Sequence, residues 1–283
     1  MQAKVQHMQP VTQASTKLRA WGVSDVGKVR ANNQDSGYFD PTIAMVADGV
    51  GGSAAGDVAS ATIVQEVAHA MRGHAGDKGP AELSRQIGAA VAQANRQLRA
   101  IGQTEPAFSG MATTLSGLAV MPGGVLIFHI GDSRIYLLRD RVLSPVTSDQ
   151  SWVQMLLDEG LISAAEATEH PMRNMLLHCL AGSPTDIDAL NFEALAVQPG
   201  DRFALVSDGL SSYLPEHFFR RIMLDCAEPQ AAAERLNKAA VRRSLDNVTV
   251  IVADITDEII DAPGILIGAA SGYAESSALP KLG

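Results

Sequence analysis

The sequence predicts an α+β fold in which antiparallel β-sheet layers are flanked by helices. Residues 113–146 consist of short β-rich runs separated by turn signals such as Pro-Gly-Gly and Gly-Asp-Ser, and connections this brief join antiparallel neighbours. Helical patterns lie before and after that segment, which is typical of helices packed on the outside of sheets. No linker rich in Ser, Pro and Gly interrupts the regular part, so we expect a single domain.

The first half of the chain begins with strands and continues with two helices. Residues 20–23 and 43–47 are apolar runs expected to form strands, joined through a polar loop at 32–35. In residues 57–72 apolar side chains recur at 63, 64, 67 and 71, which is the spacing of a helix face. Pro80 suits the first turn of a second helix. One side of that helix carries Leu83, Ile87, Val91, Ala94 and Leu98.

The second half mixes strands and helices. We expect strands at the runs LSGLAV, VLIFHI, RIYLL and RVLSPV between residues 115 and 146, and later at 202–206 and 247–255. Helical signals occupy 151–159, 163–168 and the stretch between 215 and 243. The domain is therefore expected to span residues 19–255. A polar, Gln-rich mobile tail at 1–18 would precede it, and an extension at 256–283 of unknown role would either dock on the domain or stay mobile.

Composition excludes several classes of function. A net charge of -9 and a pI near 5.2 argue against a nucleic-acid partner, because such binding depends on Lys and Arg. The best candidate for a membrane span, residues 259–274, is broken by Asp261 and Pro263, and the N-terminus has no apolar stretch of signal-peptide length. Cys179 and Cys226 form no CxxC pair, so neither zinc nor a disulfide framework is indicated. We expect a cytoplasmic monomer.

Four acidic residues stand at the ends of predicted strands. Asp48 and Asp208 each precede a glycine after an apolar run, Asp132 follows residues 125–131, and Asp246 comes just before the last strand. A single Asp-Gly is a common turn dipeptide. Brought together without a cation, however, carboxylates about 4 Å apart would repel by roughly 4 kcal/mol at an effective dielectric of about 20. Their joint placement therefore predicts a divalent metal centre.

Three other readings of the motifs are weaker. The glycines from Gly49 loosely fit a dinucleotide-binding fingerprint with Glu66 downstream, but that site needs a parallel βαβ unit. A cysteine-based phosphatase needs an Arg six residues after the nucleophile, and position 185 after Cys179 is Thr. No Gly-x-Ser-x-Gly elbow is present. Arg30, in a polar loop, is either a solvated surface residue or a bidentate donor to a phosphate beside the acidic residues.

Six ordered motifs then resemble those of the bacterial PPM (type 2C) protein serine/threonine phosphatases. They are SDVGKVRANNQD at 24–35, ADGVGG at 47–52, GMATT at 110–114, GDSR at 131–134, SDGL at 207–210 and DNVT at 246–249. Together they cover most of residues 19–255. The resemblance implies a four-layer αββα sandwich, two antiparallel β-sheets flanked by pairs of helices.

The resemblance also implies roles for individual residues. Two Mn²⁺ or Mg²⁺ ions would be held by Asp48, which bridges them, by Asp208 and Asp246, and by the Gly49 carbonyl with several waters. Asp132 with Asp208 would hold a third, weaker ion. Arg30 would grip the substrate phosphate, while Asp35 and Asn247 would lie behind the ligands and support them. Hydrolysis would proceed by in-line attack of a water shared by the two cations, without a phosphoenzyme.

The chain departs from the family pattern at four positions. Gln34 replaces a frequent Glu, which removes a charge near the expected ions. Val50 stands where eukaryotic members carry a histidine proposed as general acid, and it has no proton to give. Ser53 and Gln150 replace frequent histidines, so the side chains at these positions differ from the family pattern.

We therefore expect a phosphatase that acts on phosphoserine and phosphothreonine in bacterial proteins phosphorylated by a cognate Ser/Thr kinase. Two alternatives remain. The chain could be a catalytically silent module that binds phosphoproteins, for which Gln34 is the best support. It could also be a two-metal phosphoesterase that acts on small phosphates.

Overall fold

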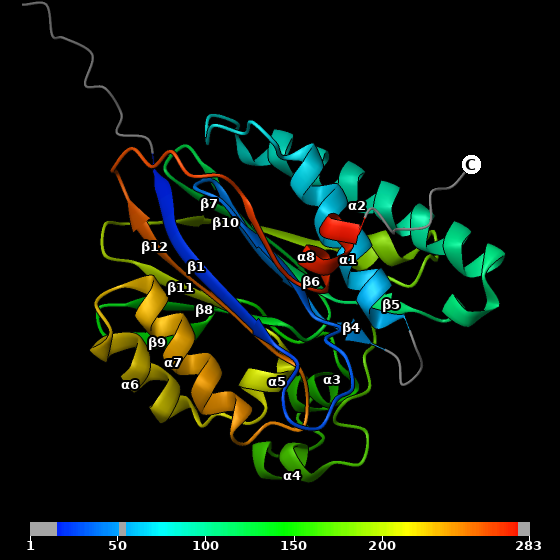
Figure 1. The fold of residues 1–283 in the computed structure, drawn as a ribbon. Helices are drawn as coiled ribbons and strands as arrows, with labels where there is room; N and C mark the ends of the chain where they lie inside the picture. Colours follow the sequence, from blue (N-terminus) through cyan, green and yellow to red (C-terminus); the bar gives the residue numbers. More distant parts are fainter. Residues whose placement is uncertain (1–15, 51–54, 277–283) are drawn as a thin grey trace, which may run out of the picture.

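Two antiparallel sheets packed face to face form the centre of the molecule in the computed structural model, which describes residues 16–50 and 55–276 (Figure 1). One sheet has five strands in the order β1-β12-β11-β8-β9, and the other has six in the order β10-β7-β6-β3-β2-β13. Every strand pairing in the described part of the chain is antiparallel. This confirms the predicted layers and leaves no parallel βαβ unit there for a dinucleotide site.

The strands follow the expected apolar runs, with small shifts at their ends. The five-stranded sheet consists of β1 (Lys17–Asp25), β8 (Arg134–Arg139), β9 (Val142–Pro145), β11 (Arg202–Val206) and β12 (Val248–Thr256). The six-stranded sheet consists of β2 (Ser36–Phe39), β3 (Ile43–Ala47), β6 (Leu115–Met121), β7 (Gly124–Ile130), β10 (Asn191–Ala196) and β13 (Ile265–Gly268). A small separate ladder joins β4 (Gly49–Val50) to β5 (Ala112–Thr113).

Helices cover the outer face of each sheet, which completes the four layers (Figure 1). The pair α1 (Gly56–Ala70) and α2 (Pro80–Thr104) packs on the six-stranded sheet, and the pair α6 (Glu216–Asp225) and α7 (Pro229–Val241) packs on the five-stranded one. A third apolar cluster fills the space between the two sheets. The four-layer αββα sandwich is therefore confirmed.

Shorter elements lie near the ends of the strands. They are α3 (Trp152–Asp158), α4 (Ala164–Glu169), α5 (Asp208–Ser211) and two 3₁₀ turns at Pro106–Phe108 and Asp186–Ala189. Of the helices that the structure describes, none combines the length and the apolar character that a bilayer crossing requires.

Several elements differ from the sequence expectation. Strands β2, β10 and β13 were not predicted: β2 is only four residues long, and β10 is largely exposed, so neither shows a strong apolar pattern. The helical stretch between 215 and 243 is broken at 226–228, before Pro229 begins α7. The first strand starts at Lys17, two residues before the expected domain boundary. The predicted N-terminal tail falls almost wholly on residues 1–15, outside the described part.

The C-terminal extension docks on the domain over its described residues. Strand β13 pairs with β2 at the edge of the six-stranded sheet, and α8 (Ala269–Ser276) follows it. The Ala269 N–H donates to the Asp35 carbonyl at 2.8 Å, and the Ala270 N–H donates to Ser36 Oγ at 3.1 Å. The extension therefore contacts the start of β2, directly behind the predicted site.

Candidate metal centre

The four strand-end carboxylates meet in one cavity of about 140 Å³. Asp48 follows β3 and Asp132 follows β7; these strands are separated by β6 and run in the same direction, so both end at one edge of their sheet. Asp208 follows β11 and Asp246 precedes β12, and because these neighbours are antiparallel, the two residues lie at one edge of the other sheet. The remaining lining residues are Arg30, Gln34, Gly49, Val50 and Asn174.

The glycine after each of two carboxylates is required by close packing of the backbone. A Cβ atom on Gly49 would lie 2.3 Å from the Gly56 carbonyl oxygen, and one on Gly209 would lie 1.8 Å from the Asn247 carbonyl oxygen. Neither glycine has a positive φ, so the reason is space and not turn geometry. Each Asp-Gly pair thus lets a second segment of backbone approach the carboxylate-bearing one.

Side-chain hydroxyl groups fix the backbone of Asp48. Thr114 Oγ1 accepts a hydrogen bond from the Asp48 N–H at 2.9 Å, while the Thr114 N–H and Thr113 Oγ1 both donate to the Asp48 carbonyl at 2.9 Å. Thr114 Oγ1 also contacts Ser133 Oγ at 2.7 Å, and all three hydroxyl residues are buried. The GMATT and GDSR motifs therefore hold the segment that carries the first carboxylate.

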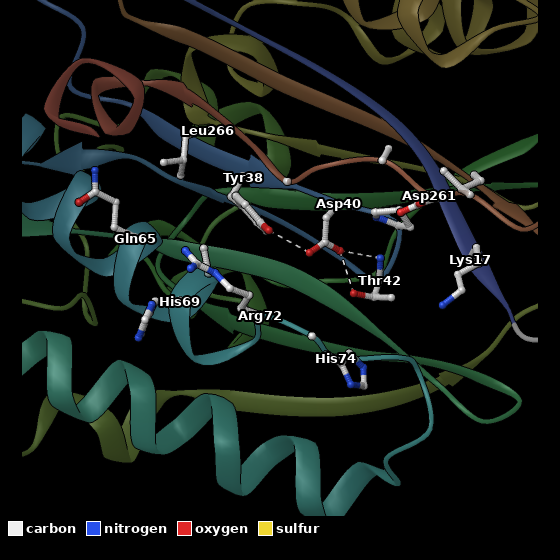
Figure 2. A pocket seen from close by; sticks show the side chains of 16 residues that line it. Lys17, Tyr38, Asp40, Thr42, Gln65, His69, Arg72, His74, Asp261 and Leu266 are labelled. Atoms are coloured by element: carbon white, nitrogen blue, oxygen red, sulfur yellow. Dashed lines mark hydrogen bonds between the residues drawn. The ribbon is translucent and has the colours of Figure 1, made fainter. Parts of the chain in front are cut away.

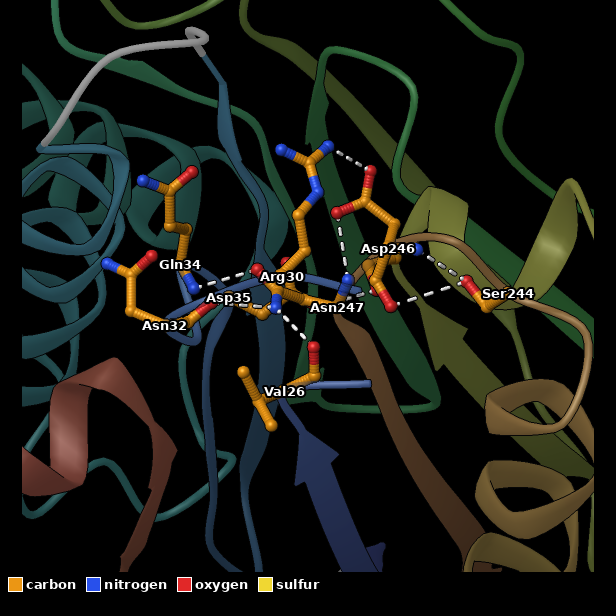
Figure 3. A network of polar contacts seen from close by, with 9 residues as sticks. Val26, Arg30, Asn32, Gln34, Asp35, Ser244, Asp246 and Asn247 are labelled. Atoms are coloured by element: carbon orange, nitrogen blue, oxygen red, sulfur yellow. Dashed lines mark hydrogen bonds and ion pairs between the residues drawn. The ribbon is translucent and has the colours of Figure 1, made fainter. Parts of the chain in front are cut away.

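The Asn247 side chain fixes the backbone of the loop that carries Arg30 (Figure 3). Its Oδ1 accepts from the Gln34 N–H at 2.9 Å, and its Nδ2 donates to the carbonyls of Val26 at 2.9 Å and Asn32 at 3.0 Å. Only 4% of Asn247 is exposed, so these bonds are shielded from water. The side chain spans the loop from residue 26 to residue 34 and ties it to the start of β12.

Burial and mutual repulsion both disfavour the charged forms of the carboxyl groups. Burial raises the pKa of Asp132 to about 8, and the charge of Asp208 adds to this rise. Burial also raises the pKa of Asp48 well above its ordinary value, helped by the charges of Asp35 and Asp208. For Asp208, burial and Asp246 raise the pKa, while a hydrogen bond with Asp48 and the charge of Arg30 oppose the rise. In their ionised forms these carboxylates carry more negative charge than Arg30 offsets, so a bound divalent cation would favour ionisation.

Asp35 lies behind the cavity and is almost completely buried, with 1% of its surface exposed. Burial raises its pKa to about 7, although Ser207 Oγ donates a hydrogen bond to Asp35 Oδ2 at 2.7 Å. Neither Asp35 nor Asn247 lines the cavity.

The carboxylates share the cavity but are not arranged as a ready-made cation site. Among the residues that the structure describes, no three Asp, Glu, His or Cys side chains come together in a metal-binding group. Asp246 is instead turned toward Arg30, whose guanidinium donates to Asp246 Oδ2 at 2.6 Å (Figure 3). Asp246 Oδ2 is therefore engaged by Arg30 in this arrangement.

The donor set nevertheless suits divalent cations. Oxygen ligands from carboxylates and a backbone carbonyl are those that Mg²⁺ and Mn²⁺ prefer, and no histidine or cysteine lines the described cavity. The unbalanced negative charge is what such ions would neutralise. The residues present therefore fit the expected ions.

Three features at this end of the sandwich were not assigned from sequence. Asn174 lines the cavity from the segment after α4, where an Arg-Asn pair looks like any polar loop. Arg134 makes a two-pronged ion pair with Asp149, at 2.7 and 2.6 Å. Gln150, which replaces a frequent histidine, accepts from the Gly131 N–H at 3.1 Å and so fixes the turn before Asp132. Gly51, Gly52 and Ser53 lie outside the described residues.

A larger cavity of about 790 Å³ lies away from these residues, beside the C-terminal end of α1 (Figure 2). Its Asp40 is fully engaged: Oδ2 accepts from the Tyr38 hydroxyl at 2.9 Å, and Oδ1 accepts from the backbone and side chain of Thr42. None of the predicted site residues lines it. Size alone therefore does not identify the reactive site here.

Comparisons with known proteins agree with the fold and the motifs. A family model described as protein phosphatase 2C matches residues 28–246. The serine/threonine protein phosphatase PstP of Mycobacterium tuberculosis is 39% identical over 266 residues, which are 93% of this chain and 50% of PstP. The chain thus spans about half the length of that relative. The serine/threonine phosphatase stp of Listeria monocytogenes is 32% identical over 247 residues, which are 84% of this chain and 97% of stp.

Solved structures show the same fold. The crystal structure of M. tuberculosis PstP superposes with a TM-score of 0.76 at 39% identity and covers 84% of this chain and 98% of that one. The PstP catalytic domain in complex with two manganese ions gives a TM-score of 0.76 at 37% identity and covers 86% of this chain and 100% of that one. The family model covers well over half of the chain and PstP is 39% identical over 93% of it, and this chain belongs to the protein phosphatase 2C family.

Proposed function

We propose that this chain is a metal-dependent protein phosphatase that hydrolyses phosphoserine and phosphothreonine. The observation that carries the proposal is the cavity in which Asp48, Asp132, Asp208 and Asp246 meet beside Arg30. Family membership and the manganese-bound PstP relative support it. When bound, two Mn²⁺ or Mg²⁺ ions would activate a water for attack on phosphorus and neutralise the departing oxygens.

Four aspartates and one backbone carbonyl would hold the ions. Asp48, Asp208, Asp246 and the Gly49 carbonyl would hold the two ions, and Asp132 with Asp208 would hold a third. Their buried, mutually repelling carboxylates make cation binding favourable.

Arg30 would bind the phosphate. Its planar guanidinium can donate two parallel hydrogen bonds to phosphate oxygens. In the structure Arg30 donates a hydrogen bond to Asp246. An incoming phosphate would bind Arg30 and the ions would bind Asp246, so both partners of this ion pair would take part in the reaction. Asn247 would keep the Arg30 loop in register through its bonds to Val26, Asn32 and Gln34. Val50 lines the same cavity but has no proton to donate to the leaving group.

We further propose that the substrates are cytoplasmic proteins phosphorylated by a Ser/Thr kinase. The two cysteines, Cys179 and Cys226, are both free, which suits a reducing compartment. Burial raises the pKa of the Cys179 thiol, which disfavours the thiolate that a cysteine-based phosphatase needs.

The test is hydrolysis of a phosphothreonine peptide by protein stripped with chelator and then titrated with Mn²⁺. We expect no turnover after stripping and full recovery with the ion. Asp208→Asn should abolish turnover and weaken manganese binding measured by calorimetry, whereas Asp77→Asn, at an exposed position that lines none of the cavities described above, should change neither. Turnover that survives the chelator would contradict the proposal. Tight binding of the peptide without turnover would instead support the catalytically silent module, and a preference for small phosphates would support the phosphoesterase.

A further inference from the structure

A run of hydrogen bonds connects the C-terminal extension to Gly49. It starts at the Ala270 N–H, which donates to Ser36 Oγ at 3.1 Å, and Ser36 Oγ lies 2.8 Å from Ser60 Oγ. Ser60 Oγ donates to the Gln34 carbonyl at 2.6 Å, and the Gly49 N–H donates to the same carbonyl at 3.2 Å. The run therefore ends at the residue whose own carbonyl is expected to bind one of the ions.

The direction of the bonds in this run is fixed by its two ends. A carbonyl oxygen can only accept, so the Ser60 hydroxyl donates to Gln34, and Ser60 Oγ accepts from the Ser36 hydroxyl. A second acceptor for Ser60, the Asp57 carbonyl, is farther away at 3.3 Å. Ser36 and Ser60 are fully buried, so water cannot replace a lost partner. Bonds that point the same way in such an interior strengthen one another.

Helix α1 holds Gly49 from a second side. A Cβ atom on Gly56, the first residue of α1, would lie 2.8 Å from the Gly49 carbonyl oxygen, so the helix can start this close only with glycine there. Ser60 follows Gly56 by about one helical turn. The same helix thus contacts Gly49 directly at its start and indirectly through the Ser60 hydroxyl.

Helix α8, where the run begins, is itself fixed to α1 (Figure 1). The Tyr273 hydroxyl donates to Asp57 Oδ2 at 3.0 Å, and Gln65 Nε2 donates to the Ala270 carbonyl at 2.9 Å. The first N–H groups of a helix have no partner within it, and the Ala270 N–H finds its partner in Ser36. The extension therefore presents this donor from a fixed position.

We propose that Ser36 and Ser60 are positioning residues for the metal centre, and that α8 acts through them to hold the Gly49 carbonyl in place for an ion. The proposal rests on the proposed function, because it takes this carbonyl as a metal ligand. With the run intact, Gln34 and Gly49 are ordered before an ion arrives. Without one of the hydroxyls, part of that ordering has to accompany ion binding, so the affinity falls.

The experiment measures Mn²⁺ binding by calorimetry to the whole chain after its metal has been removed with chelator. Ser60→Ala and Ser36→Ala each remove one hydroxyl of the run, and the double variant removes both. Thr62→Val is the matched control, because it removes another buried hydroxyl of α1, which donates to the Val58 carbonyl of the same helix at 2.7 Å. Thermal unfolding of each protein reports the loss of stability separately from the loss of affinity.

We expect Ser60→Ala to weaken Mn²⁺ binding about 10-fold, a size typical of residues that support metal ligands. Ser36→Ala should weaken it by a smaller factor. The double variant should bind as Ser60→Ala does, because the two hydroxyls act in one run and their effects are not independent. Thr62→Val should bind Mn²⁺ as the wild type does, even where its melting temperature falls.

Three results would overturn the positioning role: wild-type affinity in both serine variants, equal weakening in Thr62→Val, or losses from the two serines that multiply in the double variant. If Ser60→Ala does not fold, Ser36→Ala decides between weakened and wild-type affinity. A wild type that binds no Mn²⁺ would instead overturn the proposed function itself.

Discussion

Asp35→Asn is expected to stabilise the metal-free protein at alkaline pH. The Asp35 carboxyl is buried directly behind the carboxylate cavity, and its pKa is raised to about 7 mainly by burial. A carboxyl whose pKa is higher in the folded than in the unfolded protein binds its proton more tightly when folded. Its contribution to stability is therefore complete below the unfolded pKa and is lost as the pH rises through the folded pKa.

The size of the effect follows from that rise. The change in the Asp35 pKa from the ordinary 3.8 to about 7 is roughly three pH units, each worth about 1.4 kcal/mol, so the charged form costs about 4 kcal/mol above pH 7. Asparagine avoids this cost but weakens the hydrogen bond from Ser207, which is worth about 1 kcal/mol. The electrostatic effect is the larger one above pH 7, and the hydrogen-bond loss is the larger one near pH 4.

The measurement is urea unfolding in EDTA between pH 4 and pH 8.5. We expect the variant to be about 3 kcal/mol more stable than the wild type at pH 8 and slightly less stable at pH 4, with the difference changing across the interval between the two pKa values. Asp77→Asn provides the control, because position 77 is exposed and does not line the carboxylate cavity. A stability gain for Asp35→Asn that does not depend on pH would refute the reasoning.

Two further predictions concern other positions. Gly268→Ala should lower the unfolding free energy by at least about 2 kcal/mol, because φ there is +69° and the new Cβ would lie 2.2 Å from the Asp35 carbonyl oxygen. Gly272→Ala in α8 is the control: a Cβ there would have no atom within 4 Å, so this change should not lower the melting temperature. Equal effects of the two substitutions would contradict this account. His129 is buried between Ser116 Oγ at 2.8 Å and the Ser148 carbonyl at 2.9 Å, and burial lowers its pKa, so the stability that it contributes is present above pH 6.5 and is lost as the pH falls. In denaturant titrations from pH 5 to 7, His129→Gln should lose stability less steeply toward acid than the wild type, and identical slopes would speak against a neutral buried histidine.

Sequence patterns located most elements because hydrophobic periodicity is a local property. The runs at 43–47 and 202–206 coincide with β3 and β11, since each is buried along its whole length and so reads as an uninterrupted apolar segment. Strand β10 was not predicted because most of its residues are exposed. Strand β13 was not predicted because it pairs with the sheet edge formed by β2, which exists only in the folded chain. Neither strand is specified by its own residues alone.

For the candidate site too, some features follow from the local sequence and others from contacts between distant segments. The sequence by itself determined which residues could act: strand-end aspartates, glycines beside two of them, and an arginine in a polar loop, all recognisable from local pattern and from ordered motifs. Only the tertiary structure decided that four strand ends from two sheets open on one cavity, that Arg30 pairs with Asp246, and that Asn174 lines this cavity. The reason is physical: a segment's own periodicity records which of its faces is buried, whereas contacts between distant segments depend on strand order and direction, which no single segment encodes.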